Sequence, residues 1–222
     1  MLFYSHDNGK LADDLRKEID AVTLTTKAAD GTVTKTLDVT SLKENCPLLL
    51  SAYQEVLRDR SMGTSVREVM EDTYLDQYLL KKGAMLQMPS RIIHQDPDLW
   101  GDDVAEFNPR RFMPGGATKQ PKPSCFRGFG GGKTLCPGRH FATNEILAVV
   151  ATFLVRFDMK PAGGKKWEFP TTLNTAMAAT IMEPDTDVEV EVDVRKGFEG
   201  VKWVVRLDDS DKTFAIVVED KE

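Results

Sequence analysis

The sequence contains few metal-binding residues, and those present are far apart. Its 222 residues include three cysteines and three histidines. The cysteines are Cys46, Cys125 and Cys136, and no two of them form a C-x-x-C pair. This spacing excludes the usual zinc sites and the C-x-x-C-H attachment sequence of c-type haem. An odd number of cysteines without a signal-peptide pattern indicates a reducing compartment.

The chain also lacks an excess of positive charge and a long apolar run. Its formal net charge is −6, so we expect no general attraction to nucleic acid or to an anionic membrane surface. No stretch has the roughly 20 apolar residues of a transmembrane helix, and we find no internal repeat. With 41% hydrophobic residues, the chain can bury a sizeable core as one large domain or two small ones.

A glycine run stands next to a lone cysteine in residues 128–141, GFGGGKTLCPGRHF. A phosphate-binding loop G-x-x-x-x-G-K-[ST] that ends at Thr134 requires glycine at position 127, where this chain has Arg127. A dinucleotide-binding fingerprint fails by the same count at its last glycine. Pro121 and Pro123 also exclude the apolar strand that both motifs need upstream. Nucleotide binding is therefore not expected.

Counted from the cysteine, the same residues fit a different pattern, F-x-x-G-x-x-x-C-x-G-x-x-x-A. Its fixed positions are Phe129, Gly132, Cys136, Gly138 and Ala142. The pattern resembles the haem-ligand signature of the cytochrome P-450 family. The resemblance implies that Cys136 binds haem iron as a thiolate. The other haem contacts that it implies are Phe129, Gly130, Lys133, Gly138 and Ala142. The simpler alternative is that Cys136 is a buried, inert cysteine.

The residues around Cys136 suit a thiolate ligand. Pro137 is well placed as the first residue of a helix, which would put Cys136 at a helix N-terminus, where unpaired N–H groups and the helix dipole favour an anion. Glycines 130–132 allow a tight loop whose N–H groups can point at the sulfur. Residues 141–157 are apolar on nearly all sides beyond Ile146, which predicts a buried helix.

An E-x-x-R sequence lies upstream, at Glu55 and Arg58. On spacing alone this is an exposed i,i+3 ion pair. Members of the cytochrome P-450 family carry E-x-x-R in the helix before their small sheet, and a further arginine in a segment resembling P-x-R-F. That segment is 109–112 here, and the matching residue is Arg111. The resemblance implies that Glu55, Arg58 and Arg111 form a buried charge network beneath the cysteine loop.

Four further residues concern the haem propionates. Arg67 lies where the family often places a propionate-binding arginine, although a plain surface arginine is equally consistent with the sequence. His94 either approaches a propionate or bonds only to backbone. The family commonly has arginine or histidine two residues before the cysteine, whereas this chain has Thr134. Lys133 can substitute there as a point charge. Similar loops occur in the branch with sterol hydroxylases and prostacyclin synthase, which includes an isomerase.

Periodicity predicts the remaining elements. We expect helices over 10–22 and from Pro47 to about Ser61, and a hairpin over 23–39 that turns at Asp30-Gly31. Strands are predicted at 65–70, 76–88, 201–207 and 213–220. In residues 187–194, valines alternate with acids, which predicts a half-buried strand with one acidic face. The fold class expected is mainly α with small β-sheets (α+β), the C-terminal part of the cytochrome P-450 fold.

The resemblance covers residues 1–195 and leaves 196–222 as an unassigned extension. It implies that the complete protein is a haem-thiolate monooxygenase, which inserts one oxygen atom of O₂ into a small organic substrate. Its implied partner is NADPH-cytochrome reductase, and its implied location is the cytosolic face of the endoplasmic reticulum membrane, through an N-terminal anchor. We expect this chain to lack both that anchor and the oxygen-activating helix, and therefore to be cytoplasmic. The alternatives are a truncated, non-catalytic haem-binding or partner-dependent chain, and a haem-thiolate isomerase.

Overall fold

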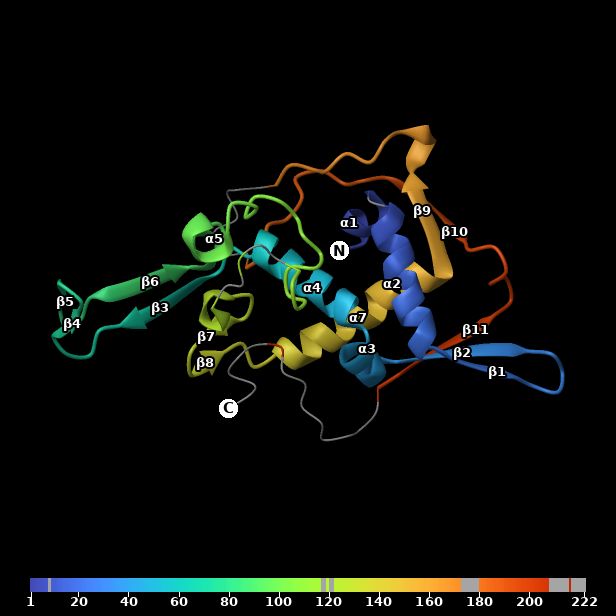
Figure 1. The fold of residues 1–222 in the computed structure, drawn as a ribbon, viewed down its shortest axis with the longest axis horizontal. Coiled ribbons are helices and arrows are strands. Elements are labelled where there is room, and N and C mark those ends of the chain that lie inside the picture. The colour runs from blue at the N-terminus through green and yellow to red at the C-terminus, as the bar shows by residue number, and fades with distance from the viewer. Residues whose placement is uncertain (8, 117–118, 120–121, 173–179, 208–215, 217–222) are drawn as a thin grey trace.

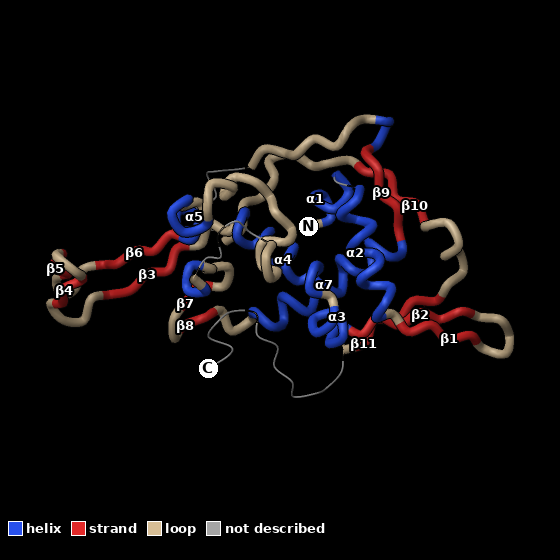
Figure 2. The backbone as a smooth tube through the Cα atoms, viewed as in Figure 1, coloured by secondary structure: helices blue, strands red, loops and turns tan. Residues whose placement is uncertain are grey.

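The computed structural model describes residues 1–7, 9–116, 119, 122–172, 180–207 and 216. Helices occupy the centre of the molecule, and short strands lie around them (Figure 1 and Figure 2). The expected class, helices with small sheets, is confirmed.

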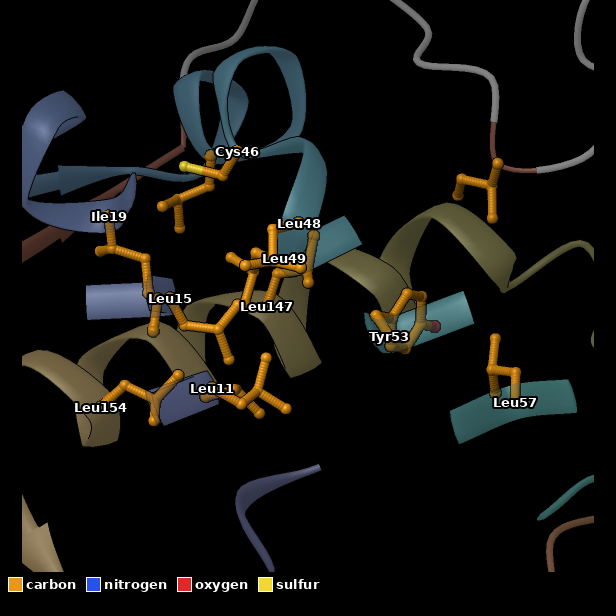
Figure 3. Packing of buried hydrophobic residues seen from close by; sticks show 14 of the residues in the cluster. Leu11, Leu15, Ile19, Cys46, Leu48, Leu49, Tyr53, Leu57, Leu147 and Leu154 are labelled. Carbon is orange, nitrogen blue, oxygen red and sulfur yellow. The ribbon is translucent and has the colours of Figure 1, made fainter. Parts of the chain in front are cut away.

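Three helices supply most of the core: α2 (Gly9–Val22), α4 (Pro47–Arg60) and α7 (Arg139–Arg156). Leu15 and Ile19 on α2 are fully buried, and they meet Leu49 of α4 and Leu147 of α7. Figure 3 shows these side chains pointing toward one another. The short helix α1 (Leu2–Asp7) precedes α2. Both predicted helices, over 10–22 and from Pro47, are confirmed.

Helix α4 begins at Pro47, where the missing N–H of proline costs nothing. The next two backbone N–H groups, of Leu48 and Leu49, donate to the Glu18 carboxylate at 2.9 Å each. A side chain of α2 therefore caps α4, and it satisfies donors that a helix N-terminus leaves unpaired.

Helix α3 (Val39–Asn45) is one of the short helices that the sequence did not predict. Asp38 caps it, because its side chain accepts hydrogen bonds from the N–H groups of Thr40 and Ser41. An aspartate before a helix is a recognised start signal, but the helix has only seven residues. So short a segment carries little periodicity of its own.

A three-stranded sheet joins distant parts of the chain. Strands β1 (Leu24–Lys27) and β2 (Val33–Asp38) form the predicted hairpin, in which Gly31 has a φ of 87°. Strand β11 (Lys202–Arg206) pairs in parallel with β2. The predicted strand at 201–207 is thus confirmed, whereas the strand predicted at 213–220 lies outside the described residues except for Ile216.

A two-stranded ribbon projects from the helices (Figure 1). It pairs β3 (Thr64–Glu68) with β6 (Met85–Pro89), and its far end is the hairpin of β4 (Thr73–Leu75) and β5 (Tyr78–Leu80). These strands confirm the predictions at 65–70 and 76–88. The chain continues into two short helices, α5 (Ser90–His94) and α6 (Pro97–Trp100). A 3-10 turn, η1 (Pro123–Cys125), precedes the cysteine loop.

The chain leaves α7 into β9 (Phe157–Pro161), which pairs with β10 (Val190–Val194); the turn η2 (Ala162–Gly164) follows β9. The alternating valines were expected to make β10 half-buried, and that prediction is wrong. Every residue of β10 is exposed. Val190 and Val192 line a cavity of about 550 Å³ instead of meeting a packed layer. The alternation predicts the strand, but it does not guarantee that another element covers its apolar face.

Candidate functional site

The cysteine loop is a small hairpin next to the start of α7 (Figure 1). Strands β7 (Gly130–Gly131) and β8 (Thr134–Leu135) pair antiparallel. The φ values of Gly130 and Gly132 are 88° and 73°, which side chains disfavour. The backbone N–H of Cys136 donates to the carbonyl of Phe129 at 3.0 Å. The glycines thus allow the reversal that brings the cysteine back beside Phe129.

Cys136 is exposed, whereas the two other cysteines are buried. Burial raises the pKa of Cys46 to about 12, so that thiol stays protonated. The alternative that Cys136 is a buried, inert cysteine is therefore wrong. Of the three thiols, that of Cys136 is the one that a metal ion from outside can reach.

Helix α7 begins two residues later than predicted. Its first residue is Arg139, and Gly138 is the residue before it, with φ −83° and ψ 3°. Pro137 therefore belongs to the turn between Cys136 and the helix. The N–H of Arg139 donates to the Cys136 carbonyl at 3.3 Å, so the cysteine still lies at the helix N-terminus. The Arg139 guanidinium also donates to this carbonyl at 3.4 Å, which places a positive charge beside the cysteine.

Gly138, two residues after the cysteine, leaves room beside the sulfur. A side chain at Gly138 would place its Cβ 3.9 Å from the Sγ of Cys136. Gly132 has open space where its side chain would point. Ala142 donates its backbone N–H to the Gly138 carbonyl at 2.9 Å and is half-buried. These three small residues add little side-chain bulk around the thiol, which leaves room for a flat ligand.

The other predicted haem contacts are distributed around this hairpin. Phe129 is partly buried against the core, and Lys133 is exposed. Arg67, on β3, donates to the carbonyl of Val66 at 2.8 Å and reaches that of Gly131 at 3.5 Å. The structure thus brings Arg67 to the cysteine hairpin across 64 residues of chain.

Glu55, Arg58 and Arg111 meet in the interior, and all three side chains are fully buried. Arg58 binds the Glu55 carboxylate with two hydrogen bonds, of 2.8 and 2.9 Å. The Nε of Arg111 lies 3.1 Å from both oxygens of that carboxylate. Arg111 also pairs with Asp103 at 3.0 Å. Two arginines on one carboxylate leave a surplus positive charge, which Asp103 balances.

This network extends to backbone far along the chain. Arg58 donates to the carbonyl of His94 at 2.8 Å, and the N–H of Asn108 donates to Glu55 at 3.0 Å. Arg111 donates to the carbonyl of Glu106 at 3.1 Å. The network therefore joins α4 to α5 and to the segment that leads into the cysteine loop. It fixes the position of α4 relative to segments that lie 36 and 53 residues further along the chain.

His94 connects the network to the cysteine loop. Its Nδ1 lies 3.0 Å from the carbonyl of Arg58, and its Nε2 accepts the N–H of Arg127 at 2.8 Å. Both partners are backbone groups, which confirms the simpler of the two predictions for this residue. Burial, with the positive charges of Arg58 and Arg127, lowers the pKa of His94 from 6.5 to about 4. The ring is thus neutral and positions the start of the loop.

One residue of this region had no predicted role. Arg127 appeared in the sequence only as the residue that breaks a phosphate-binding pattern. In the structure its guanidinium packs against Gly131, and its Nε is buried without a hydrogen-bond partner among the described residues. No sequence pattern indicates this placement, because it depends on how the hairpin folds back.

The residues of this site fit a haem group. An exposed thiol, a low surface of small residues and a buried, unpaired guanidinium nitrogen match a flat metal complex that carries carboxylates. Among the described residues, no group of three or more histidine, cysteine or acidic side chains is arranged to hold a metal ion. In the same part of the chain, no helix is both long and apolar enough to cross a membrane.

The cavity of about 550 Å³ is separate from this site. Its walls include Met1, Phe153, Trp167, Phe169 and Val192, and none of its lining residues belongs to the cysteine loop. Its lining is mainly apolar, and none of the described residues that form it is a cysteine or a histidine.

Comparison with known proteins identifies the family of this chain. The family model for cytochrome P-450 matches residues 1–186. Cytochrome P-450 monooxygenase nodJ of Hypoxylon pulicicidum is 35% identical over an alignment 225 residues long, which covers 98% of this chain and 44% of that protein. A bifunctional cytochrome P-450/NADPH–P-450 reductase of Alternaria alternata, ALT2, is 34% identical over 51% of this chain and 10% of its own length.

A solved structure supports the same assignment. The retinoic acid-bound cyanobacterial protein CYP120A1 superposes with a TM-score of 0.66 and 25% identity, over 86% of this chain and 40% of that one. The chain thus spans less than half the length of each of these relatives. Because the family model covers most of the chain, and the sequence and fold relatives agree with it, this chain belongs to the cytochrome P-450 family.

Proposed function

We propose that this chain forms the haem-binding part of a haem-thiolate monooxygenase, in which the Cys136 thiolate would bind the iron. The observation that carries the proposal is the exposed Cys136 thiol, which lies at the N-terminus of α7 behind a glycine hairpin. When bound, a thiolate-ligated haem activates O₂, so that one oxygen atom can be inserted into an organic substrate. The haem contacts in this proposal are Phe129, Gly130, Arg67, Lys133, Gly138 and Ala142.

The protein's own task at this site is to hold the sulfur where a metal can bind it. The N-terminus of α7 and the Arg139 guanidinium both lie beside Cys136. The hairpin orients the cysteine through the hydrogen bond to Phe129. Behind it, His94 and the Glu55 network hold the loop against α4. Such preorganisation lowers the cost of positioning a ligand.

The complete protein would take electrons from a reductase and act on a small organic substrate. The relative from Alternaria alternata, whose name joins a cytochrome P-450 to an NADPH reductase, supports that partner. We further propose that the complete protein works on the cytosolic face of the endoplasmic reticulum membrane.

Haem titration of the purified chain tests the ligand assignment. The unmodified chain should bind haem, and its reduced CO complex should show the absorption band that thiolate ligation produces. Cys136→Ala should lose that band, while Cys125→Ala, which removes a buried thiol nearby in the chain, should keep it. The proposal is wrong if Cys136→Ala leaves the band unchanged.

A second function is favoured by the outer surface of α7. Ile146 and Val149 lie three residues apart on one helix face, and they are 37% and 49% exposed. Phe141, at the start of the same helix, is 72% exposed. An apolar face of this kind usually marks an interaction site. The chain would then act as a haem-binding unit that becomes active only against a further protein surface.

A further inference from the structure

The guanidinium of Arg127 fills the space into which a side chain at position 131 would point. A Cβ added to Gly131 would lie 2.3 Å from Nη1 of Arg127 and 2.6 Å from its guanidinium carbon. Such distances are impossible between real atoms, so residue 131 must be glycine for the guanidinium to lie there. The guanidinium of Arg127 therefore packs directly against the backbone of Gly131.

The guanidinium has few partners in this place. One of its nitrogens donates to the hydroxyl of Ser65 at 3.3 Å, and its Nε is buried with no partner among the described residues. A buried donor without an acceptor is costly, and more so on a charged group. An acceptor supplied by a ligand would remove that cost.

A second arginine approaches the same glycine. Nη2 of Arg67 lies 3.5 Å from the carbonyl oxygen of Gly131. Arg67 is exposed and Arg127 is half-buried. Two cations beside the same glycine repel each other, and an anion between them removes that repulsion. Carboxylate is the matching ligand, because the planar guanidinium fork binds its two oxygens at once.

Haem carries two carboxylates, and this chain has threonine at the cysteine-loop position where the family usually offers them an arginine or a histidine. That position is Thr134, and its register partner across the hairpin is Gly131. The guanidinium of Arg127 packs against Gly131, and Gly131 is the residue opposite Thr134. We infer that Arg127 binds a haem carboxylate and replaces the positive charge missing at Thr134. This inference rests on the proposed function, namely that the chain binds haem.

The test compares haem with its dimethyl ester, in which both carboxylates are blocked. Each is titrated into the unmodified chain and into Arg127→Leu, and binding is followed by the Soret absorption. We expect Arg127→Leu to bind haem about tenfold more weakly, the loss of one charge-assisted hydrogen bond. It should bind the ester as the unmodified chain does. Adding Thr134→Arg to Arg127→Leu should restore most of the affinity for haem.

Two controls separate a ligand contact from a folding defect. Arg91→Leu removes one positive charge from an exposed arginine of α5, and it should leave both affinities unchanged. Thermal unfolding of the ligand-free chain should differ little between Arg127→Leu and the parent, because the hydrogen bond to His94 is donated by the backbone N–H of residue 127. Arg127→Gln, which keeps hydrogen-bond donors without the charge, should bind haem with intermediate affinity.

The outcomes distinguish this inference from the function on which it rests. If the unmodified chain binds no haem, both are overturned. If it binds haem through Cys136, yet Arg127→Leu binds haem equally well, only the role of Arg127 is wrong. A loss of the same size for haem and for the ester also overturns that role, since it would show a contact other than the carboxylate.

Discussion

Cys136 and Cys125 lie eleven positions apart in the sequence, yet one thiol is exposed and the other buried. The difference comes from the hairpin of glycines between them, which turns the chain back before the cysteine. A signature of five fixed residues selected the cysteine that the structure leaves exposed. The same signature did not reveal Arg127, whose position depends on the closed hairpin and on a strand more than 60 residues away.

At the residue scale, the buried network makes a first prediction. Glu55→Gln leaves Arg58 and Arg111 buried without their carboxylate. We expect the free energy of unfolding to fall by about 3–5 kcal/mol, as when one partner of a buried ion pair is removed. Urea unfolding followed by circular dichroism measures the change.

The matched control is Glu71→Gln, at an exposed glutamate of the ribbon, which should leave stability within about 0.5 kcal/mol. Equal stability of the two variants would contradict the account of the network.

His94 makes a second prediction, about pH. Its pKa is 6.5 when exposed and about 4 in the fold, so between these values the unfolded chain binds more protons. Its contribution to stability is therefore complete above pH 6.5 and is lost as pH falls toward 4. The full loss is about 3 kcal/mol, and about 1 kcal/mol of it should have appeared by pH 5.5.

Urea unfolding of His94→Gln at pH 7.5 and at pH 5.5 isolates this effect. The variant should lose about 1 kcal/mol less than the parent between the two values. Parallel losses would mean that the His94 ring is not held neutral by the fold.

At the scale of elements, α7 shows how far a sequence pattern can lead. Its apolar character predicted burial on nearly all sides, and that is wrong on one face. Leu147 and Val150 are buried, whereas Ile146 and Val149 are exposed. The amino-acid composition of a helix indicates which face prefers burial. It does not indicate whether another helix or strand of the chain packs against that face. The same reason explains the exposed valines of β10.

The exposed face of α7 makes a third prediction. We expect the purified chain to self-associate through Ile146 and Val149, since no described element covers them. The double variant Ile146→Lys/Val149→Lys should shift the chain toward monomer in size-exclusion chromatography with light scattering. Its circular dichroism spectrum should stay that of the parent.

As a matched control, Leu147→Lys changes a fully buried residue of the same helix, and it should unfold the chain instead. An unchanged oligomeric state in the double variant would show that this face is not the contact.

At the scale of the whole molecule, the division at residue 195 stays a prediction. The structure gives reasons to test it, because β11 pairs with β2 and Ile216 is 2% exposed in the core. Lys35 lies over the ring of Trp203, and Arg206 pairs with Asp38 at 3.0 Å. The sequence indicated a strand at 201–207, but parallel pairing with a strand more than 160 residues earlier is not readable from local periodicity.

A fourth prediction follows for truncation. A chain that ends at residue 195 should lose at least the roughly 2–5 kcal/mol expected from removing one buried aliphatic side chain. A chain that ends at residue 216 keeps β11 and Ile216, and should be as stable as the parent. If both truncated chains match the parent in urea unfolding, residues 196–222 are an extension that the fold does not need.

The central claim is that Cys136 supplies the sulfur ligand of the haem iron. X-ray absorption at the iron edge of the haem-loaded chain tests it most directly, because it detects the atoms bonded to the metal. We predict one sulfur in the first shell for the parent and for Cys125→Ala, and none for Cys136→Ala. Sulfur retained in Cys136→Ala, or only nitrogen and oxygen in the parent, would contradict the account.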